Sequence, residues 1–356
     1  MTSTSNRILR YAVYKALAMF LVFFVSLTVF FFFFRIAPVV LGGGNPLAPA
    51  KAAFDPLIAA SGSALQGNPA AASWIGYISG IYGLDKPLFP DQLLLFYRNI
   101  FTFNFGNSLY TFKPVSHELL MRLPYTLVIY LVGVLAPILI GYSLAVYSVK
   151  NRGRIIDILI TLSSLFSYVV PSYVALLLLY YLLGYIPKVT IGIKIFPLPT
   201  RAPLVGSGMS IEDLFYLAWY VTPIYLALIL TSFGQWSYYL RQLLVSEAEK
   251  DYVISARAVG LREDDILKKE ITPNIRPPLI TSLGYTIPTI FGGSIVLEML
   301  SSWPGVATYA YNAMSLGDFP VIVGFYTISA LLLVVSIYIA DLLVILLDPR
   351  VRIVQR

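Results

Sequence analysis

The sequence contains no cysteine and only one histidine, His117. Disulfides, thiolate metal sites and histidine metal clusters are therefore excluded. Several catalytic signatures are missing as well, namely a GxxxxGK[ST] phosphate loop, a GxSxG elbow and an HExxH pair. These absences predict a non-catalytic chain with no cofactor and no metal of its own.

Charge is also scarce. Only 12% of the 356 residues are charged, 58% are hydrophobic and the mean hydropathy is +0.78. This composition predicts an integral membrane protein. Six stretches reach the roughly 20 mostly apolar residues that a membrane span needs. Because they show no strand-like alternation, we expect an all-α polytopic membrane protein with six transmembrane helices. The six stretches are approximately 12–35, 124–148, 156–183, 214–240, 278–300 and 320–347.

The net charge of +7 follows from where the 25 Lys and Arg lie. Positive residues close to the ends of spans stay in the cytoplasm. They gather ahead of the first span, as at Arg7, after the second, as at Lys150, between Arg241 and Arg276, and after the last span. We therefore expect a multi-pass protein of the cell membrane with both termini cytoplasmic. Nucleic-acid binding is a poor interpretation of this charge.

Ionisable residues are nearly absent from the span interiors. Asp157, Glu298 and Asp341 lie near the ends of spans, where a carboxylate can be solvated or can snorkel. A proton or sodium symporter is therefore disfavoured, and energy is expected to come from a partner. A pore lined by hydroxyl groups is compatible with the sequence of 281–289, which includes Thr281, Ser282, Tyr285, Thr286 and Thr289.

The chain before the core divides in two. In residues 1–40 the apolar run from Ala16 to Phe34 exceeds the 7 to 15 residues of a cleaved signal sequence, which indicates a retained signal-anchor helix. Residues 41–123 form an expected external region, and its part 41–78 is rich in Gly, Ala, Ser and Pro, as in loops and small helices.

Further along the external region, apolar residues recur with helical spacing and predict an amphipathic helix on the outer membrane surface. This helix could be a packing element over the bundle or a docking surface for an external partner, and both alternatives stay open. The apolar residues are Leu93, Leu94, Phe96, Tyr97, Ile100 and Phe101.

The expected core domain, 124–356, contains one long charged segment, residues 246–278. Ser246 and Glu249 have the spacing of a capping box, which predicts the start of a helix. Gly260 fits the left-handed position that ends one. A second helix is expected with acidic residues in its first turn and an end at Thr272-Pro273. Two short helices that meet at a glycine on the cytoplasmic side make a shape that a separate ATPase could grip.

The run from Asp251 to Leu261, DYVISARAVGL, resembles the DYVxxARAxGL signature of inner-membrane permeases of binding-protein-dependent ABC transporters, in the dipeptide and oligopeptide class. The general motif of these permeases has Glu-Ala-Ala where this chain has Ile254-Ser255-Ala256, and the peptide class commonly lacks that Glu. The resemblance extends over nearly the whole chain, although residues 41–78 match nothing specific.

Six further segments carry the same resemblance in the same order. GLDKPL (83–88), FGNSL (105–109) and Arg122-Leu123-Pro124 with Thr126-Leu127 are similar to landmarks of the first permease subunit of that class. Glu298 with Trp303-Pro304-Gly305 resembles an external ExxxxWPG segment, Asp318-Phe319-Pro320-Val321 resembles DYPV, and Leu347 to Arg352 resembles the LLDPRIR terminus.

The resemblance implies a type I ABC importer permease fold and a pore for di- or oligopeptides, which an external solute-binding protein would deliver. A second permease subunit would complete the pore as a heterodimer, and two cytoplasmic ATPase subunits would bind ATP and Mg. Residues 246–278 would then be the coupling loop. The implied ATPase-coupling residues are Tyr252, Val253, Ala256, Arg257, Gly260 and Leu261, and the implied external gate is Glu298, Trp303, Pro304 and Gly305. No substrate-contacting residue is identified.

Other interpretations stay open. The same importer class also moves oligosaccharides and metal complexes. A membrane scaffold without a pore, or an ion-coupled carrier, would belong to a different class. The individual residues also have structural explanations, since Gly260 is expected at a helix end in any case. Tyr252 and Val253 could rest on lipid headgroups, Trp303 could be a membrane-interface anchor, and Glu298 could pair with a neighbouring subunit.

Overall fold

The computed structural model describes residues 2–33, 76–77, 80–83, 86–200, 210–293 and 295–347. Within these ranges every regular element is a helix, apart from one isolated β-bridge between Asn107 and Pro114. The expected all-α class is confirmed. Most of the expected loop region 41–78 and the ending after Leu347 lie outside the described residues.

Five of the described helices are long and apolar enough to cross a membrane. They correspond to the expected spans one, two, four and six, together with the second half of span three. This confirms a helical, multi-pass architecture. The five segments are Leu9–Phe31, Val115–Lys150, Ser172–Ile191, Ile211–Ala248 and Phe319–Ile345.

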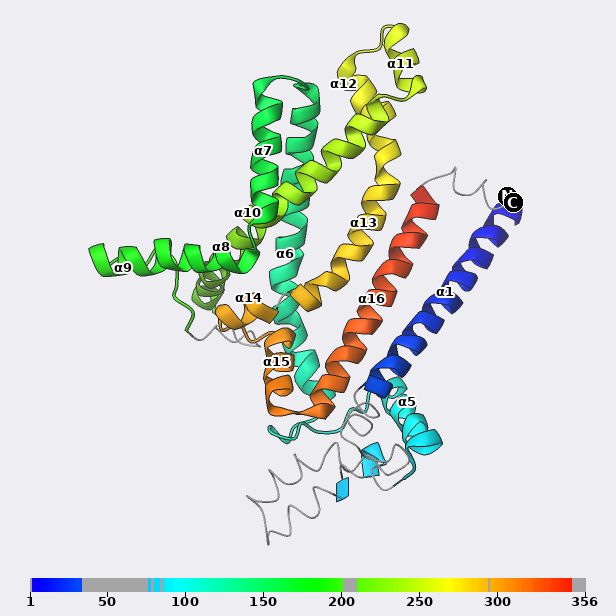
Figure 1. Ribbon diagram of the computed structural model, residues 1–356, viewed down its shortest axis with the longest axis vertical. Coiled ribbons are helices and arrows are strands. Elements are labelled where there is room, and N and C mark those ends of the chain that lie inside the picture. Colours follow the sequence, from blue (N-terminus) through cyan, green and yellow to red (C-terminus); the bar gives the residue numbers. More distant parts are fainter. Residues whose placement is uncertain are drawn as a thin grey trace. The chain divides into compact units, whose positions relative to one another are not determined.

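The expectation of one continuous helix over 156–183 is wrong. Helix α7 (Ile155–Val169) ends at Val170, whose backbone is extended, and α8 (Ser172–Leu179) begins after Pro171. The cause is steric, because a proline ring disfavours the helical conformation in the residue before it. Helix α8 continues through η3 (Tyr180–Tyr185) and α9 (Ile186–Ile191) in a direction that turns away from α7 (Figure 1).

The expected span 278–300 also differs from what is observed. Helix α13 (Thr272–Gly293) begins earlier than expected, and α14 (Ile295–Leu300), which carries Glu298, ends where the expected span ends. The chain then continues into α15 (Val306–Leu316) and α16 (Phe319–Leu347).

The chain forms two compact units, and the first comprises residues 1–121 and 309–338. In it, α1 (Thr2–Phe31) runs beside α16, and the short helix α5 (Leu93–Phe101) lies against α1 (Figure 1). Stacked rings hold these helices together, with 4.5 Å between the centroids of Phe24 and Tyr97 and 4.1 Å between those of Phe30 and Tyr326. The amphipathic helix expected from Leu93 onward exists, and within this unit it is a packing element.

The second unit comprises residues 122–308 and 339–356. Most of α6 (Val115–Lys150), with α7 and α10 (Ile211–Ala248), forms its centre. At the crossing of α7 and α10 the Ser167 hydroxyl donates to the Leu230 carbonyl (2.6 Å) and accepts from the Gly234 amide (3.2 Å). Leu230 and Gly234 are four residues apart, so the hydroxyl is inserted into the hydrogen-bond ladder of α10.

Gly234 permits this close crossing. A Cβ at this position would lie 2.1 Å from the Ser164 carbonyl oxygen, which belongs to the backbone of α7 and cannot move alone. Gly133 is also tight, but its added Cβ would meet a flexible atom, Cδ1 of Leu228, at 2.4 Å. Gly234 therefore sets the distance between two helix axes, whereas Gly133 only sets a side-chain rotamer.

We predict that Gly234→Ala destabilises the folded protein by about 2 kcal/mol or more, in the upper range for an overpacked core. Gly133→Ala is the matched control and should cost clearly less, because Leu228 can change rotamer. Both stability changes are measured by heating the detergent-purified variants and by monitoring the fraction that stays folded with size-exclusion chromatography. Equal midpoints for the two variants would contradict this view of the crossing.

Candidate functional site

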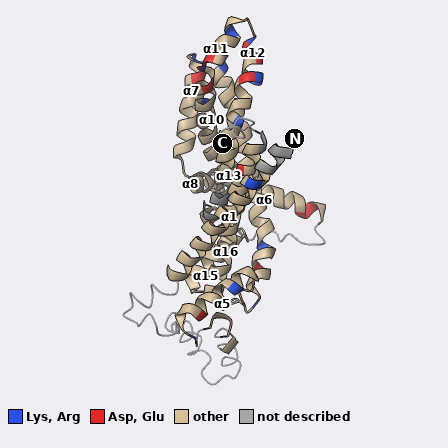
Figure 2. Ribbon diagram, turned by 90° about the vertical axis from the view of Figure 1, so that its right-hand side faces the viewer, with Lys and Arg blue, Asp and Glu red and all other residues tan. Residues whose placement is uncertain are grey.

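Within the charged segment 246–278, residues 251–271 form a projection between the end of α10 and the start of α13. It consists of α11 (Asp251–Ala258), α12 (Glu263–Asp265) and η4 (Ile266–Ile271), and η4 leads directly into α13. Lys, Arg, Asp and Glu gather on this end of the second unit, while the long helices carry few charges (Figure 2). Asp251 lies in the first turn of α11 and Arg257 in its last, as the helix macrodipole favours.

Gly260 ends α11 in the way the sequence predicts. Its φ is +84°, in the left-handed region. The Gly260 amide donates to the Arg257 carbonyl (3.0 Å), and the Leu261 amide donates to the Ala256 carbonyl (3.2 Å). This pair of bonds is a Schellman motif, which satisfies two carbonyls at the helix end. An added Cβ at Gly260 would meet no atom within 4 Å, so only the backbone conformation requires glycine here.

The capping box predicted at Ser246 is wrong. Ser246 lies inside α10, which runs on to Ala248, and α11 begins after Lys250, whose side chain makes no capping hydrogen bond. An N-cap needs a non-helical backbone, but α10 continues here because Leu244, Glu247 and Ala248 are still buried. The chain turns only at Lys250, with ψ at 149°.

The predicted end of the second helix at Thr272-Pro273 is also wrong. Thr272 has helical φ and ψ, and α13 begins there without a break. Pro273 comes just after the π-helical turn η4, and it has no amide hydrogen to donate to that turn. The Thr272 hydroxyl donates to the Leu267 carbonyl (2.7 Å) and so supplies a local bond at this junction. The expected acidic first turn is present, with Glu263, Asp264 and Asp265 in α12.

Val253 joins α11 to the long helices. Its side chain is 0% exposed and belongs to one apolar cluster with residues of α10, η4 and α13. The cluster also includes Leu240, Leu244, Ile266, Leu267, Ile271 and Ile275. Tyr252 and Ala256 pack against its edge. These three predicted coupling residues therefore hold α11 on the protein.

Polar contacts strengthen the same junction. The Tyr252 hydroxyl donates to a Glu247 carboxylate oxygen at 2.6 Å and accepts from the Asn274 amide at 2.9 Å. Glu247 lies at the end of α10 and Asn274 in the first turn of α13. Tyr252 thus connects the three helices that meet at the projection.

The outward surface of the projection is formed by other residues. Ile254, Val259 and Leu261 are exposed, Val259 by 77%. Of these, only Leu261 was predicted as a coupling residue. Apolar side chains that cap an otherwise charged projection are typical of a site that another protein covers.

Ion pairs surround the base of the projection. Lys150 pairs with Asp264 (2.6 Å), Arg152 with Glu249 (2.8 Å), and the predicted coupling residue Arg257 with Glu263 (2.8 Å). The Lys150 ammonium holds the pKa of Asp264 below its usual range. A pocket of about 500 Å³ lies among these charges, with Val245 and Ile271 in its wall. Because the pairs are largely exposed, each contributes little stability.

A buried ion pair lies beside this base. The Arg241 guanidinium binds both carboxylate oxygens of Asp157, at 2.8 and 2.9 Å. The Ser148 hydroxyl and the Gly153 amide also donate to this carboxylate. Asp157 is only 5% exposed, so the expectation that it is solvated or snorkels is wrong. Its position is explained by its partners, which tie the end of α6 and the start of α7 to α10.

At the other end of the second unit, Glu298 is 0% exposed. The expectation that Glu298 is solvated or snorkels is therefore also wrong. Its carboxylate accepts from the Thr126 hydroxyl at 2.8 Å and from the Thr308 amide at 2.9 Å. Thr308 lies in the first turn of α15, so Glu298 acts as a helix cap supplied from elsewhere in the chain. A Cβ at Gly305 would lie 2.3 Å from this carboxylate, which explains the glycine.

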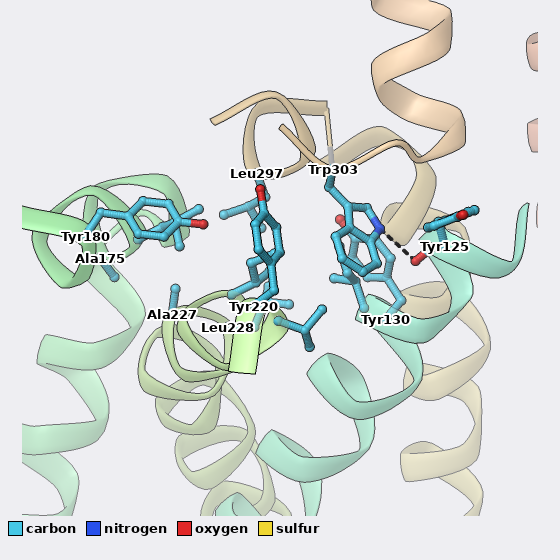
Figure 3. Close-up of a cluster of buried hydrophobic side chains, with 13 residues drawn as sticks. Tyr125, Tyr130, Ala175, Tyr180, Tyr220, Ala227, Leu228, Leu297 and Trp303 are labelled. Carbon is cyan, nitrogen blue, oxygen red and sulfur yellow. Dashed lines mark hydrogen bonds between the residues drawn. The ribbon is translucent and has the colours of Figure 1, made fainter. Parts of the chain in front are cut away.

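Trp303 completes this arrangement. It is 0% exposed, and its indole nitrogen donates to the Tyr125 carbonyl at 2.9 Å (Figure 3). Its ring lies among the rings of Tyr125 and Tyr220. A membrane-interface anchor would be exposed to lipid, whereas this tryptophan is a core residue. The predicted gate residues Glu298, Trp303 and Gly305 are thus brought together, and Pro304 lies between the last two.

In the first unit, two segments with family resemblance meet in the same manner. Asp318 precedes α16, and its carboxylate accepts from the Ser108 hydroxyl at 2.5 Å and from the Leu109 amide at 3.1 Å. Asp318 is 2% exposed, and burial raises the pKa of its carboxyl group. Asp318 therefore holds the FGNSL segment at the start of α16.

Comparison with known proteins gives the family. Residues 137–353, which include the projection, Asp157 and Glu298, match the model described as binding-protein-dependent transport system inner membrane component. The chain belongs to this family.

Among the relatives of this permease, two are peptide transport proteins by name and one imports a metal complex. This permease is 30% identical over 276 residues to the oligopeptide transport system permease protein AppB of Bacillus subtilis, covering 76% of this chain and 83% of that protein. It is 28% identical over 274 residues to the dipeptide transport system permease protein DppB of Lactococcus lactis, with shares of 76% and 83%. It is also 28% identical over 273 residues to the metal-staphylopine import system permease protein CntB of Staphylococcus aureus, with shares of 75% and 81%.

The sequence predicted the helix end at Gly260 in this projection. Ile254 and Val259 were missed, because the apolar residues of such a short segment do not reveal which side is buried. The pairing of Asp157 with Arg241 spans 84 positions and has no local pattern.

We predict that Asp157→Ala destabilises the permease by about 3 kcal/mol, because it leaves the guanidinium of Arg241 without its buried partner. The matched control is Glu249→Ala, which removes the acid of the exposed Arg152 pair and should change little. Thermal unfolding of the purified permease measures both. A loss in the Asp157 variant no larger than that of the control would show that the buried pair has no special role.

Proposed function

We propose that this chain is one pore-forming subunit of an ATP-driven importer, and that it passes di- or oligopeptides that an external binding protein delivers. The family match supports the transport role, and the names of AppB and DppB support peptides as the solute class. The relative CntB supports one alternative solute, a metal complex. The partners are a second, different permease subunit and two cytoplasmic ATP-binding subunits.

The observation that carries the coupling role is the construction of the projection. Its inner side is fixed to α10 and α13 through Val253 and Tyr252, while its outer side presents Ile254, Val259 and Leu261. A partner that binds the outer side can push on both long helices, because α11 is packed on the end of each. We place this projection and both termini in the cytoplasm, where the positive residues lie.

The cycle follows from this geometry. ATP binding draws the two ATPase subunits together, and each moves the projection seated on it. Helices α10 and α13 then tilt as rigid bodies and open the pore alternately to either side of the membrane. Gly260 fixes the angle at which the end of α11 meets α12. The loop with Glu298 and Trp303, on the opposite side, forms a firm external boundary of the pore.

Gly260→Val tests this role. A β-branched residue strains the left-handed backbone, since even an ordinary side chain costs about 1 to 2 kcal/mol there. The turn should shift, and ATP-driven uptake and substrate-stimulated ATP hydrolysis should fall together to a small fraction of the parent rates in the reconstituted complex. The measurement is peptide uptake and phosphate release in proteoliposomes.

Gly192→Val is the matched control. Gly192 ends α9 with a φ of +74°, and an added Cβ there would also meet no atom within 4 Å. The substitution therefore imposes a similar backbone strain outside the projection. This variant should transport like the parent. If both variants transport normally, or if both lose activity equally, the turn at Gly260 has no specific coupling role.

A further inference from the structure

A pocket of about 610 Å³ lies between α7, α10 and α13 in the second unit. This volume is within the range of small-ligand sites. Trp236 and Tyr239 form part of its wall from α10, Ser282 and Tyr285 from α13, and Tyr168 from α7. None of the described residues that line it is charged.

Two glutamines on α10 distinguish this pocket from a gap between apolar helices. Gln235 and Gln242 both line it and are exposed. They lie seven positions apart with Tyr238 and Tyr239 between them, so the four side chains form one stripe on a helix face. Neither carboxamide hydrogen-bonds to any residue that the structure describes, and an amide facing lipid would be costly.

The depth of the stripe makes this cost significant. Gln235 lies about 20 Å before the end of α10, at 1.5 Å per residue. Such a position in an apolar span is tolerated when the side chain faces water or a polar ligand. Hydroxyls on α13 face the same space, where the Ser282 hydroxyl donates to that of Tyr239 at 2.8 Å. The pocket therefore offers amides and hydroxyls without charge.

We propose that this pocket is a solute-contact site in which Gln235 and Gln242 hydrogen-bond the backbone amides of a passing peptide. The inference rests on the proposed function and names the contact residues that it leaves open. A carboxamide donates and accepts together, so it matches the N–H and C=O of a peptide group. Because no charge lines the site, it does not distinguish acidic from basic peptide side chains, as suits a pore for many sequences.

Charge introduced at Gln235 tests the proposal. In the full complex, reconstituted with its binding protein and ATPases, uptake of trialanine is compared with that of tripeptides having a central lysine or a central glutamate. Gln235→Glu should favour the lysine peptide over the glutamate peptide by about tenfold relative to the parent, and Gln235→Lys should reverse that preference, because one opposite charge nearby is worth that factor.

Glu212→Lys is the charge control. Glu212 is exposed in the first turn of the same helix and does not line the pocket. This variant should keep the parent ratio. Active Gln235 variants that keep the parent ratio of lysine-peptide to glutamate-peptide uptake would overturn the contact site. The rate of peptide uptake by the parent complex tests the proposed function separately. A parent complex that moves none of the three peptides contradicts both peptide assignments.

A second measurement needs no transport. Since the chain has no cysteine, Gln242→Cys provides a single thiol. A membrane-impermeant maleimide should label this thiol in the assembled complex much faster than the thiol of Leu230→Cys, which is exposed on the same helix outside the pocket. Equal, slow labelling would show that lipid or the second subunit fills the space, and this result would overturn the proposal even if the Gln235 variants are inactive.

Discussion

The burial of Val253 is the contact on which the coupling geometry depends. Its side chain closes an apolar cluster that α11 shares with the ends of α10, η4 and α13. Without this contact α11 would be a short helix with little reason to persist, since isolated helices of this length are unstable in water. With it, the projection is a stiff extension of two long helices. In the proposed function, a partner that binds the exposed residues Ile254, Val259 and Leu261 would therefore move both long helices.

Buried carboxylates perform a second task away from the projection. Glu298 caps α15, Asp318 precedes α16, and Asp157 binds Arg241 beside α10. Each of the three acids satisfies several donors, which offsets the cost of removing a charge from water. In an apolar protein such contacts fix helix ends more specifically than packing of similar aliphatic side chains can. These three buried acids are therefore found where helices begin or cross.

The sequence allowed the helical class and the turn at Gly260 to be predicted, because apolar run length and left-handed glycines are local signals. The break after Val169 could also have been read from Pro171. Other features depend on distant residues. Arg241 lies 84 positions from Asp157, and Thr126 lies 172 positions from Glu298, so the burial of both acids was missed. The Ser246 pattern failed for the opposite reason, since a local capping signal was overridden when α10 continued into the apolar cluster.

The central claim is that an ATPase subunit covers the outer side of α11 and moves it. A photo-crosslinking residue in place of Val259, which points away from the cluster and is 77% exposed, tests it in the purified complex. The account predicts one adduct between this permease and an ATPase subunit, with a yield that changes when ATP binds. An intact, transporting complex in which Val259 crosslinks only to lipid, or to nothing, would contradict it.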